Sequence, residues 1–542
     1  MSLGGQGTIL VKPVINPISS LELENGAEIT AFNQRYKLSF VINGSNSLDV
    51  VRYKNFQNPK LQQSLSLTGS GNSVAISEDG LIAVATAEET NNRGSIEFFQ
   101  IKDDGSIRRK GSVGVGNLPD SVAFSPDGRK LVVANEGEPN QFYGTEDGKD
   151  PAGSISILKI DARKPEESKV TSLDFSSFST RELRKQGVRI SGLEGTTPAT
   201  DIEPEYVTIA PDSKSAFVTL QENNAIAAIN LKSDKIQSIF SAGIQNYKKA
   251  GIFDTSDEDG GFNPGKRDFF GLRMPDGAST FEQNGKTYVI TANEGDSRVR
   301  PDNVNFVAPD EGTYFYGTKE SGTIFESFED PLTGKLVYVT NSQEGSKGSF
   351  EAEVEDEFFI TLKYGAAADD GFYSDEIRAG DLSNPSSNKI VSGANEGRLN
   401  TIADRNTKEN LFAYGGRSFT IYDSVTGQVV YDSGDRLDHI VNKLGLYDDG
   451  RSDDKSIEPE GVVTATLGGR TYAFIGLERP TESVIPVFDV SNPKNPKLET
   501  VFQSPSSLSP EGLTFIQTGR KSGVLQVANE VSGTLDIFEF GL

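Results

Sequence analysis

Carboxylates recur at two fixed places in a pattern that repeats along the chain. One copy, LPDSVAFSPDGRKLVVANEGEP at 118–139, reads as an apolar strand, a tight turn and a second apolar strand. Two residues before the first apolar position of the first strand, five of eight copies carry an acid: Asp120, Glu205, Asp276, Glu460 and Glu511. At the end of the second strand, six copies carry a glutamate: Glu88, Glu136, Glu222, Glu294, Glu478 and Glu530. Converging carboxylates repel one another and need a counter-charge, so the pattern favours a cation site.

The other reactive side chains narrow the chemistry. The chain has no cysteine and one histidine, His439, which excludes thiolate nucleophiles, disulfides, cysteine-based zinc sites and zinc sites with several histidines. His439 lies in RLDHIVNKLG, a helix-like stretch where a structural histidine is expected. Any metal should therefore be bound by oxygen atoms, as calcium, magnesium and manganese are. Asp-rich loops at 254–261 and 447–455 resemble calcium loops, although neither has EF-hand spacing.

The repeat predicts the elements that hold these acids. Turn sequences such as SEDG, SPDG and QNG separate the first two strands, and a third and fourth strand follow in most copies. Four antiparallel strands per unit are a propeller blade, so we predict one all-β domain over 1–542, a β-propeller of eight four-stranded blades. Seven blades is the alternative, if one of the weak copies at 27–53 and 397–423 is not a blade. Because the last copy ends at its third strand, we expect an N-terminal strand near 8–24 to close the ring.

Strand direction places both acid positions on one face of the propeller. In an antiparallel blade the first strand starts where the second strand ends. The long segments between strands, among them an insertion at 299–370, should lie on that same face. Long loops gathered on one side of a rigid scaffold are a common place for a functional site.

Charge and hydropathy exclude several classes of partner. The net charge is −25, which argues against binding nucleic acid or an anionic membrane. No segment approaches the roughly 20 apolar residues of a membrane helix, so membrane insertion is not expected. Residues 1–17 have no basic segment followed by a sustained apolar one, so we predict no conventional signal peptide.

Several longer motifs resemble a known family, the choice-of-anchor I domain. They include ANEGEP at 134–139, DIEPEY at 201–206, SDEDGG at 256–261, ANEGDSR at 292–298, GGRSFTIYD at 415–423, RSDDK at 451–455 and EPEG at 458–461. This family includes mesenchyme-specific cell-surface glycoproteins and atypical alkaline phosphatases of cyanobacteria. The resemblance implies an extracellular or cell-surface propeller, and it suggests metal-dependent hydrolysis of phosphomonoesters.

Two functions follow, and the sequence leaves open whether the protein is an enzyme. In the first, a phosphohydrolase of the alkaline-phosphatase type acts on a small phosphorylated substrate with calcium or another oxygen-ligated divalent ion. The expected metal ligands are Glu136, Glu294, Asp296, Asp453 and Glu460. The arginines expected to clamp the phosphate are Arg298, Arg417 and Arg479. In the second, a non-catalytic calcium-binding surface protein binds a polymer, and the repeated acids are largely structural. The oligomeric state is not predicted.

Overall fold

The computed structural model describes most of the chain outside 299–396. It describes residues 13–298 and 397–542, apart from 25, 43–44, 89–91, 140–148, 192–195, 403–404 and 407–409. Between 299 and 396 it describes the backbone of several strands and, at Arg378 and Ala379, the side chains as well. The predicted insertion at 299–370 falls in this interval, so its place on the loop-rich face stays a prediction.

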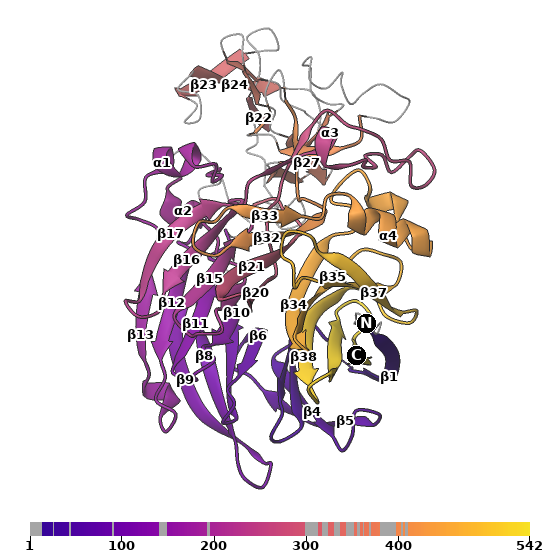
Figure 1. Ribbon diagram of the computed structural model, residues 1–542. Coiled ribbons are helices and arrows are strands. Elements are labelled where there is room, and N and C mark those ends of the chain that lie inside the picture. The colour runs from indigo at the N-terminus through magenta and orange to yellow at the C-terminus, as the bar shows by residue number, and fades with distance from the viewer. Residues whose placement is uncertain are drawn as a thin grey trace, which may run out of the picture.

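The described strands form seven four-stranded antiparallel sheets, which are the blades of the propeller (Figure 1). From the innermost strand outward, the blades are blade 1 (β2 Thr30–Asn33, β3 Leu38–Ile42, β4 Ser47–Tyr53, β5 Pro59–Ser66), blade 2 (β6 Ser70–Ile76, β7 Leu81–Ala87, β8 Arg93–Ile101, β9 Ile107–Asn117), blade 3 (β10 Pro119–Phe124, β11 Lys130–Asn135, β12 Ser154–Lys159, β13 Lys169–Leu173), blade 4 (β14 Val207–Ile209, β15 Ser215–Leu220, β16 Ala225–Asn230, β17 Lys235–Ser241), blade 5 (β20 Ala278–Gln283, β21 Lys286–Asn293, β32 Ser418–Asp423, β33 Val429–Asp432), blade 6 (β34 Pro459–Leu467, β35 Arg470–Leu477, β36 Ser483–Asp489, β37 Lys497–Ser504) and blade 7 (β38 Pro510–Gln517, β39 Ser522–Asn529, β40 Thr534–Gly541, β1 Val14–Glu22).

The innermost strands contact one another in chain order around a closed circle. Each contacts the innermost strand of the next blade, and β38 of blade 7 contacts β2 of blade 1. The N-terminal strand β1 pairs antiparallel with β40 along Val14–Glu22 and becomes the outermost strand of blade 7. The predicted all-β propeller and its closure by an N-terminal strand are therefore confirmed.

Among the described residues the propeller has seven blades, which was the alternative prediction, rather than eight. The copy at 397–423 does not build a blade of its own. Its strand β32 pairs with β21, so it supplies the third strand of the blade that the 274–298 copy begins. The chain leaves blade 5 after β21 and returns to it only at β32, so the second half of this blade reads as a separate, weak repeat in the sequence.

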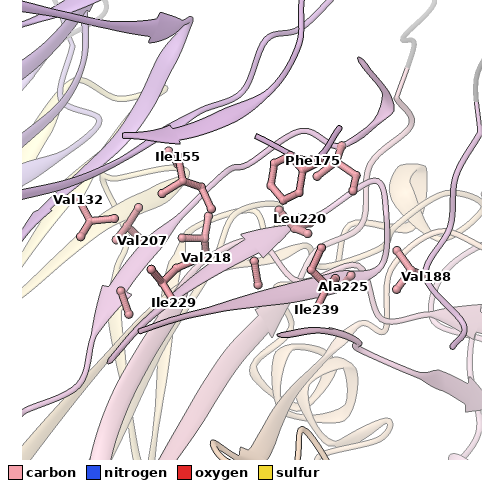
Figure 2. Close-up of a cluster of buried hydrophobic side chains, with 14 of the residues drawn as sticks. Val132, Ile155, Phe175, Val188, Val207, Val218, Leu220, Ala225, Ile229 and Ile239 are labelled. Carbon is pink, nitrogen blue, oxygen red and sulfur yellow. The ribbon is translucent and has the colours of Figure 1, made fainter. Parts of the chain in front are cut away.

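Packing between blades explains the apolar runs of the middle strands. All seven residues of β7 are buried, because neighbouring blades cover both of its faces. The outermost strand β5 instead alternates between exposed and half-buried residues. Figure 2 shows the core between blades 3 and 4, where Val132 and Ile155 face Val207, Val218 and Ile229. This interleaved core fixes how far each blade stands from the next.

Short helices lie in the connections between blades. They are α1 (Thr180–Lys185), α2 (Pro198–Asp201), α3 (Tyr247–Ala250) and α4 (Arg436–Leu444). His439 lies on α4, where its ring meets Phe262 edge-on and its Nε2 lies 3.4 Å from an oxygen of Asp435. The structural role expected for this histidine agrees with these contacts. Within the described residues, no helix is both long and apolar enough to span a membrane.

Candidate functional site

The starts of the inner strands surround a central cavity of about 470 Å³. The same repeat position lines it in all seven blades, and we call its six acidic members the ring acids: Glu28, Asp120, Glu205, Asp276, Glu460 and Glu511. Asn72 holds the corresponding position in blade 2. The sequence predicted five of these acids on one face, and the structure adds Glu28, which lies at the start of the weak copy at 27–53.

A recurring backbone conformation connects the two acid positions of a blade. The residue two before the ring acid has a left-handed φ, +43° at Leu118, +45° at Glu458 and +56° at Ser509. Its carbonyl accepts the N–H of the glutamate that follows the second strand, as between Leu118 and Glu136 at 2.8 Å. A left-handed conformation costs about 1–2 kcal/mol at a residue other than glycine. Backbone strain of this kind gathers at functional sites, where the surrounding structure holds it in place.

Glycines after three ring acids bring blades 5, 6, 7 and 1 close together. A Cβ at Gly277 would lie 2.3 Å from the carbonyl oxygen of Glu460, and one at Gly512 would lie 2.2 Å from that of Glu28. The N–H of Gly277 donates to the Glu460 carbonyl at 3.0 Å. A side chain at these positions would push the blades apart, so the acid-glycine pairs bring the ring acids of adjacent blades together.

Burial and crowding favour the protonated form of the ring acids. Burial first, and then the charges of neighbouring carboxylates, raise the pKa well above its usual range at four of them: Glu205, Asp276, Glu460 and Glu511. Burial, with Glu138 and Glu28 nearby, raises the pKa of Asp120 to about 7. At neutral pH these carboxylates need either protons or a cation to offset their repulsion.

Three carboxylates on the side of blades 5 and 6 form what we call the first acid group: Asp276, Glu294 and Glu460. One oxygen from each lies within 4.8 Å of the others. Oε2 of Glu460 is buried, and it has no hydrogen-bond partner among the residues that the structure describes. A set of three carboxylates offers only oxygen donors, which suits a hard divalent cation. The residues therefore fit the kind of ion that the sequence predicted.

A second acid group shares Glu294 and carries its own cations. Oxygens of Glu294, Glu458 and Glu478 also lie within 4.8 Å of one another. Nζ of Lys455 lies 3.0 Å from Oε1 of Glu294 and 3.4 Å from Oε2 of Glu458. Arg479 lies 2.9 Å from Oε1 of Glu478. Burial alone would raise the pKa of Glu458, but Lys455, Arg451 and Arg479 together hold it down at about 2.

A sequence model of the choice-of-anchor I domain matches residues 28–493. The chain belongs to the choice-of-anchor I family. Membership indicates a cell-surface or extracellular propeller, as the motifs in the sequence implied.

A relative in sequence and two solved structures are similar to parts or all of this chain. The choice-of-anchor I chain is 32% identical over 129 residues to Gigasin-3a of Magallana gigas, a match that covers 21% of this chain and 44% of that protein. It is similar in structure to Saccharomyces cerevisiae Sqt1, with a TM-score of 0.43 and 8% identity over 97% of this chain and 98% of the other. It is also similar to Kuenenia stuttgartiensis hydrazine synthase, with a TM-score of 0.36 and 14% identity over 98% of each chain. TM-scores this low carry no argument about function.

The structure brings some of the predicted metal ligands together and separates the others. Glu294 and Glu460 share the first acid group, and Asp296 lines the same cavity, with its Oδ1 3.6 Å from Nζ of Lys455. Glu136 belongs to neither acid group, and its charge instead helps to raise the pKa of the buried Glu205. Asp453 also lies outside both acid groups, and its carboxylate accepts a hydrogen bond from Arg378.

Two of the three predicted arginines are engaged within the protein. The Arg298 side chain is 1% exposed, and its guanidinium contacts Asp150 at 2.7 Å and Glu203 at 3.3 Å. Arg417 is buried and donates to the carbonyls of Asp254, Ser452 and Asp454, so it joins two loops. Neither of them lines the cavity.

Arg479 is the predicted arginine that lines the cavity, and its side chain is 39% exposed. Sequence reasoning missed Lys455 and Glu458, which are central to the second acid group. Both stand in or next to the motifs RSDDK and EPEG. The signal in the sequence was a lysine directly after two aspartates, in a motif next to a predicted strand. An amine that becomes buried there needs carboxylate partners.

The predicted calcium loops do meet. Asp254, Asp259 and Asp449 each place one oxygen within 4.8 Å of the others, and we call them the loop acid group. Asp449 accepts the N–H of Gly261 at 2.8 Å, which ties the 254–261 loop to the 447–455 loop. Asp254 accepts the N–H of Asn263 at 2.6 Å, so part of this charge is already met by backbone donors.

Proposed function

We propose that this protein is a cell-surface propeller that binds a divalent cation of the calcium class through Asp276, Glu294 and Glu460. The observation that carries the proposal is the buried Oε2 of Glu460, which has no hydrogen-bond partner among the described residues although it belongs to a group of three converging carboxylates. A buried carboxylate oxygen without a partner is costly, and a bound cation offsets that cost.

The surroundings favour calcium over magnesium. Calcium takes six to eight oxygen ligands in flexible geometry, whereas magnesium requires a nearly ideal octahedron. The cavity offers further oxygen donors beside the first acid group, because Glu511 and Glu205 line it as well. Extracellular calcium modules have dissociation constants of about 10⁻⁴–10⁻³ M, which we expect here.

Such an ion would join two blades. Asp276 and Glu294 flank the first two strands of blade 5, and Glu460 belongs to β34 of blade 6. A cation held by both blades would relieve their repulsion and stabilise the ring. The propeller would then offer a metal-stabilised acidic face to a surface polymer.

Phosphomonoester hydrolysis is the second candidate function, and Arg479 favours it. Its guanidinium lines the same cavity and pairs with Glu458 and Glu478, but the side chain stays partly exposed. An arginine fork of this kind can bind a phosphate through two hydrogen bonds. A bound divalent cation supplies charge stabilisation at a phosphoryl oxygen. Arg298 and Arg417 would not take part, because both are buried and neither lines the cavity.

Calcium titration of the chelator-treated protein tests the binding proposal. Glu460→Gln should weaken calcium affinity at least tenfold in calorimetry. It should also raise the melting temperature of the calcium-free protein, because it removes a repelling charge. Glu88→Gln is the matched control, since Glu88 holds a repeated acidic position but is exposed and lies outside the cavity. Equal calcium binding by wild type and Glu460→Gln would reject the site.

A turnover assay separates the two candidates. Wild-type protein would be loaded with calcium, magnesium or manganese and given a phosphomonoester, with Arg479→Met as the comparison. Release of phosphate that falls at least tenfold in Arg479→Met would support the hydrolase. An absence of turnover with all three metals would reject the hydrolase and leave the binding proposal standing.

A further inference from the structure

The two acid groups around Glu294 have the layout of a site for two cations. Each contributes three carboxylates with oxygens within 4.8 Å of one another, and Glu294 belongs to both. In two-metal sites the ions lie about 3.5–4 Å apart, a distance that a shared carboxylate can bridge. Glu294 therefore stands where a bridging ligand would stand between two cation positions.

One of these two positions is already taken by the chain itself. Nζ of Lys455 lies 3.0 Å from Glu294 and 3.4 Å from Glu458, and the lysine side chain is 11% exposed. The amine is thus within the second acid group and contacts the shared carboxylate. On the opposite oxygen of Glu294, Nε2 of Gln221 donates a hydrogen bond at 2.9 Å. The bridging carboxylate is held from both sides.

The loop that carries Lys455 is itself fixed. Arg417 donates to the carbonyls of Ser452 and Asp454, just before the lysine. Ser456, just after it, has a left-handed φ of +63° and donates its N–H to the Arg451 carbonyl at 2.9 Å. Anchors on both sides hold the backbone of Lys455, so its amine is directed into the second acid group.

The two groups differ in their charge balance. In the second group, Arg479 contacts both Glu458 and Glu478, and Arg451 also pairs with Glu458. Lys455 is the cation that contacts Glu458 and the shared Glu294 together. In the first group, Lys455 contacts the shared Glu294, while Oε2 of Glu460 stays without a hydrogen-bond partner in the described residues. An incoming divalent ion is therefore favoured in the first group and opposed in the second.

We propose that Lys455 takes the place of a second divalent cation in this cavity, so that the cavity binds one ion where its carboxylates are arranged for two. The inference rests on the proposed function, because it requires the first acid group to bind an ion. A tethered ammonium supplies fixed positive charge beside the bound ion but cannot be exchanged or removed by a chelator. Lys455 thereby sets the number of ions that the cavity holds.

Counting bound calcium per chain at saturation tests this proposal. Lys455→Met should bind one more calcium ion per chain than wild type, measured by equilibrium dialysis with elemental analysis. Lys455→Arg is the matched control, because it keeps a positive charge and should bind the wild-type number. Any ion at the loop acid group is common to all variants, so the difference between variants counts only the cavity.

The second position is checked by removing its own ligand. Adding Glu478→Gln to Lys455→Met should abolish the gained ion, since Glu478 belongs to the second group alone. If Lys455→Met is not recovered folded, Lys455→Gln serves instead, because its amide keeps an N–H donor near Glu294 without the charge. Wild-type stoichiometry in the folded neutral variants would overturn the role of Lys455.

The Glu460→Gln variant tests the proposed ion in the first acid group separately from the role of Lys455. Loss of one calcium ion in Glu460→Gln relative to wild type supports the first site, whatever Lys455 does. A Glu460→Gln variant that binds as many ions as wild type rejects the first site and with it the basis of this inference. A gain in Lys455→Met together with a loss in Glu460→Gln supports both.

Discussion

On the side of blades 2 and 3, the repeat position that lines the cavity holds Asn72 and Asp120, whereas on the side of blades 5 and 6 it holds Asp276 and Glu460. The amide of Asn72 donates to the carbonyl of Pro119 at 3.1 Å, so in blade 2 this position joins neighbouring blades directly. In blade 6 the same position leaves a buried oxygen of Glu460 without a hydrogen-bond partner among the described residues.

The residue that follows the ring position also differs between the two sides, and it decides whether the position joins blades or brings acids together. The residue after the ring position is Ser121 in blade 3 and Gly277 in blade 5. Oγ of Ser121 accepts the N–H of Val207 from blade 4 at 3.2 Å, while Gly277 brings its backbone against that of Glu460. The side of blades 2 and 3 adds hydrogen bonds between blades, whereas the side of blades 5 and 6 brings three carboxylates within 4.8 Å of one another. A cation is therefore favoured on the side of blades 5 and 6.

The largest expected effect is a pH dependence on the side of blade 3. Burial, together with the charges of Glu138 and Glu28, raises the pKa of Asp120 from 3.8 to about 7, and Asp120 in turn contributes to the raised pKa of Glu205. Between pH 4 and 7 the folded state binds the proton more tightly than the unfolded state, so stability falls as pH rises. Asp120→Asn removes the loss of stability that deprotonation of Asp120 causes, which is at most roughly 4 kcal/mol at 1.36 kcal/mol per pKa unit.

Chemical denaturation of calcium-free protein at pH 4.5 and 7.5 measures this effect. The stability lost between the two pH values should be smaller in Asp120→Asn than in wild type by up to that amount. Asp212→Asn is the control, because Asp212 lies on an exposed turn and its pKa is lowered rather than raised. The same pH slope in wild type and Asp120→Asn would show that this side of the ring carries no excess charge.

A smaller effect is expected from the contact between blades 5 and 6. Gly277→Ala would place a Cβ 2.3 Å from the Glu460 carbonyl and disturb the hydrogen bond that Gly277 donates to it. We expect a loss of about 3 kcal/mol in the free energy of unfolding, because the obstacle is backbone that cannot move alone. Ser121→Ala, at the same position in blade 3, should cost about 1 kcal/mol. Equal losses would mean that the two sides pack alike.

Most of the fold could be predicted from the sequence because propeller strands repeat in type and order. The alternation of strands and turns predicted the blades, and the missing fourth strand of the last copy predicted the closing strand β1. The blade count was harder, because blade 5 is divided. Its second and third strands, β21 and β32, are separated by more than a hundred residues, so the second half, at 397–423, resembled a separate weak copy.

The site was only partly predictable, because a repeat shows where side chains lie but not which charges offset them. The spacing predicted that Glu294 and Glu460 share a face, and they share an acid group. It could not show that Arg298 and Arg417 turn into the protein, since their partners Asp150 and Asp254 come from distant loops. For the same reason it missed Lys455, whose partners Glu294 and Asp296 follow a strand of another blade.

The smallest effect tests the one neutral position in the ring. Asn72→Asp would complete a ring of seven acids and remove the amide that donates to Pro119. Asn72→Ala removes the same hydrogen bond without adding charge, so the difference between the two variants isolates repulsion. In calcium-free protein Asn72→Asp should be less stable than Asn72→Ala by about 0.5 kcal/mol, since it lies across the ring from the first acid group and charges at that distance are partly screened. Calcium affinity should rise no more than about twofold in Asn72→Asp and stay unchanged in Asn72→Ala. A large gain in affinity would instead place the bound ion near the centre of the ring, within reach of all seven blades, rather than between blades 5 and 6.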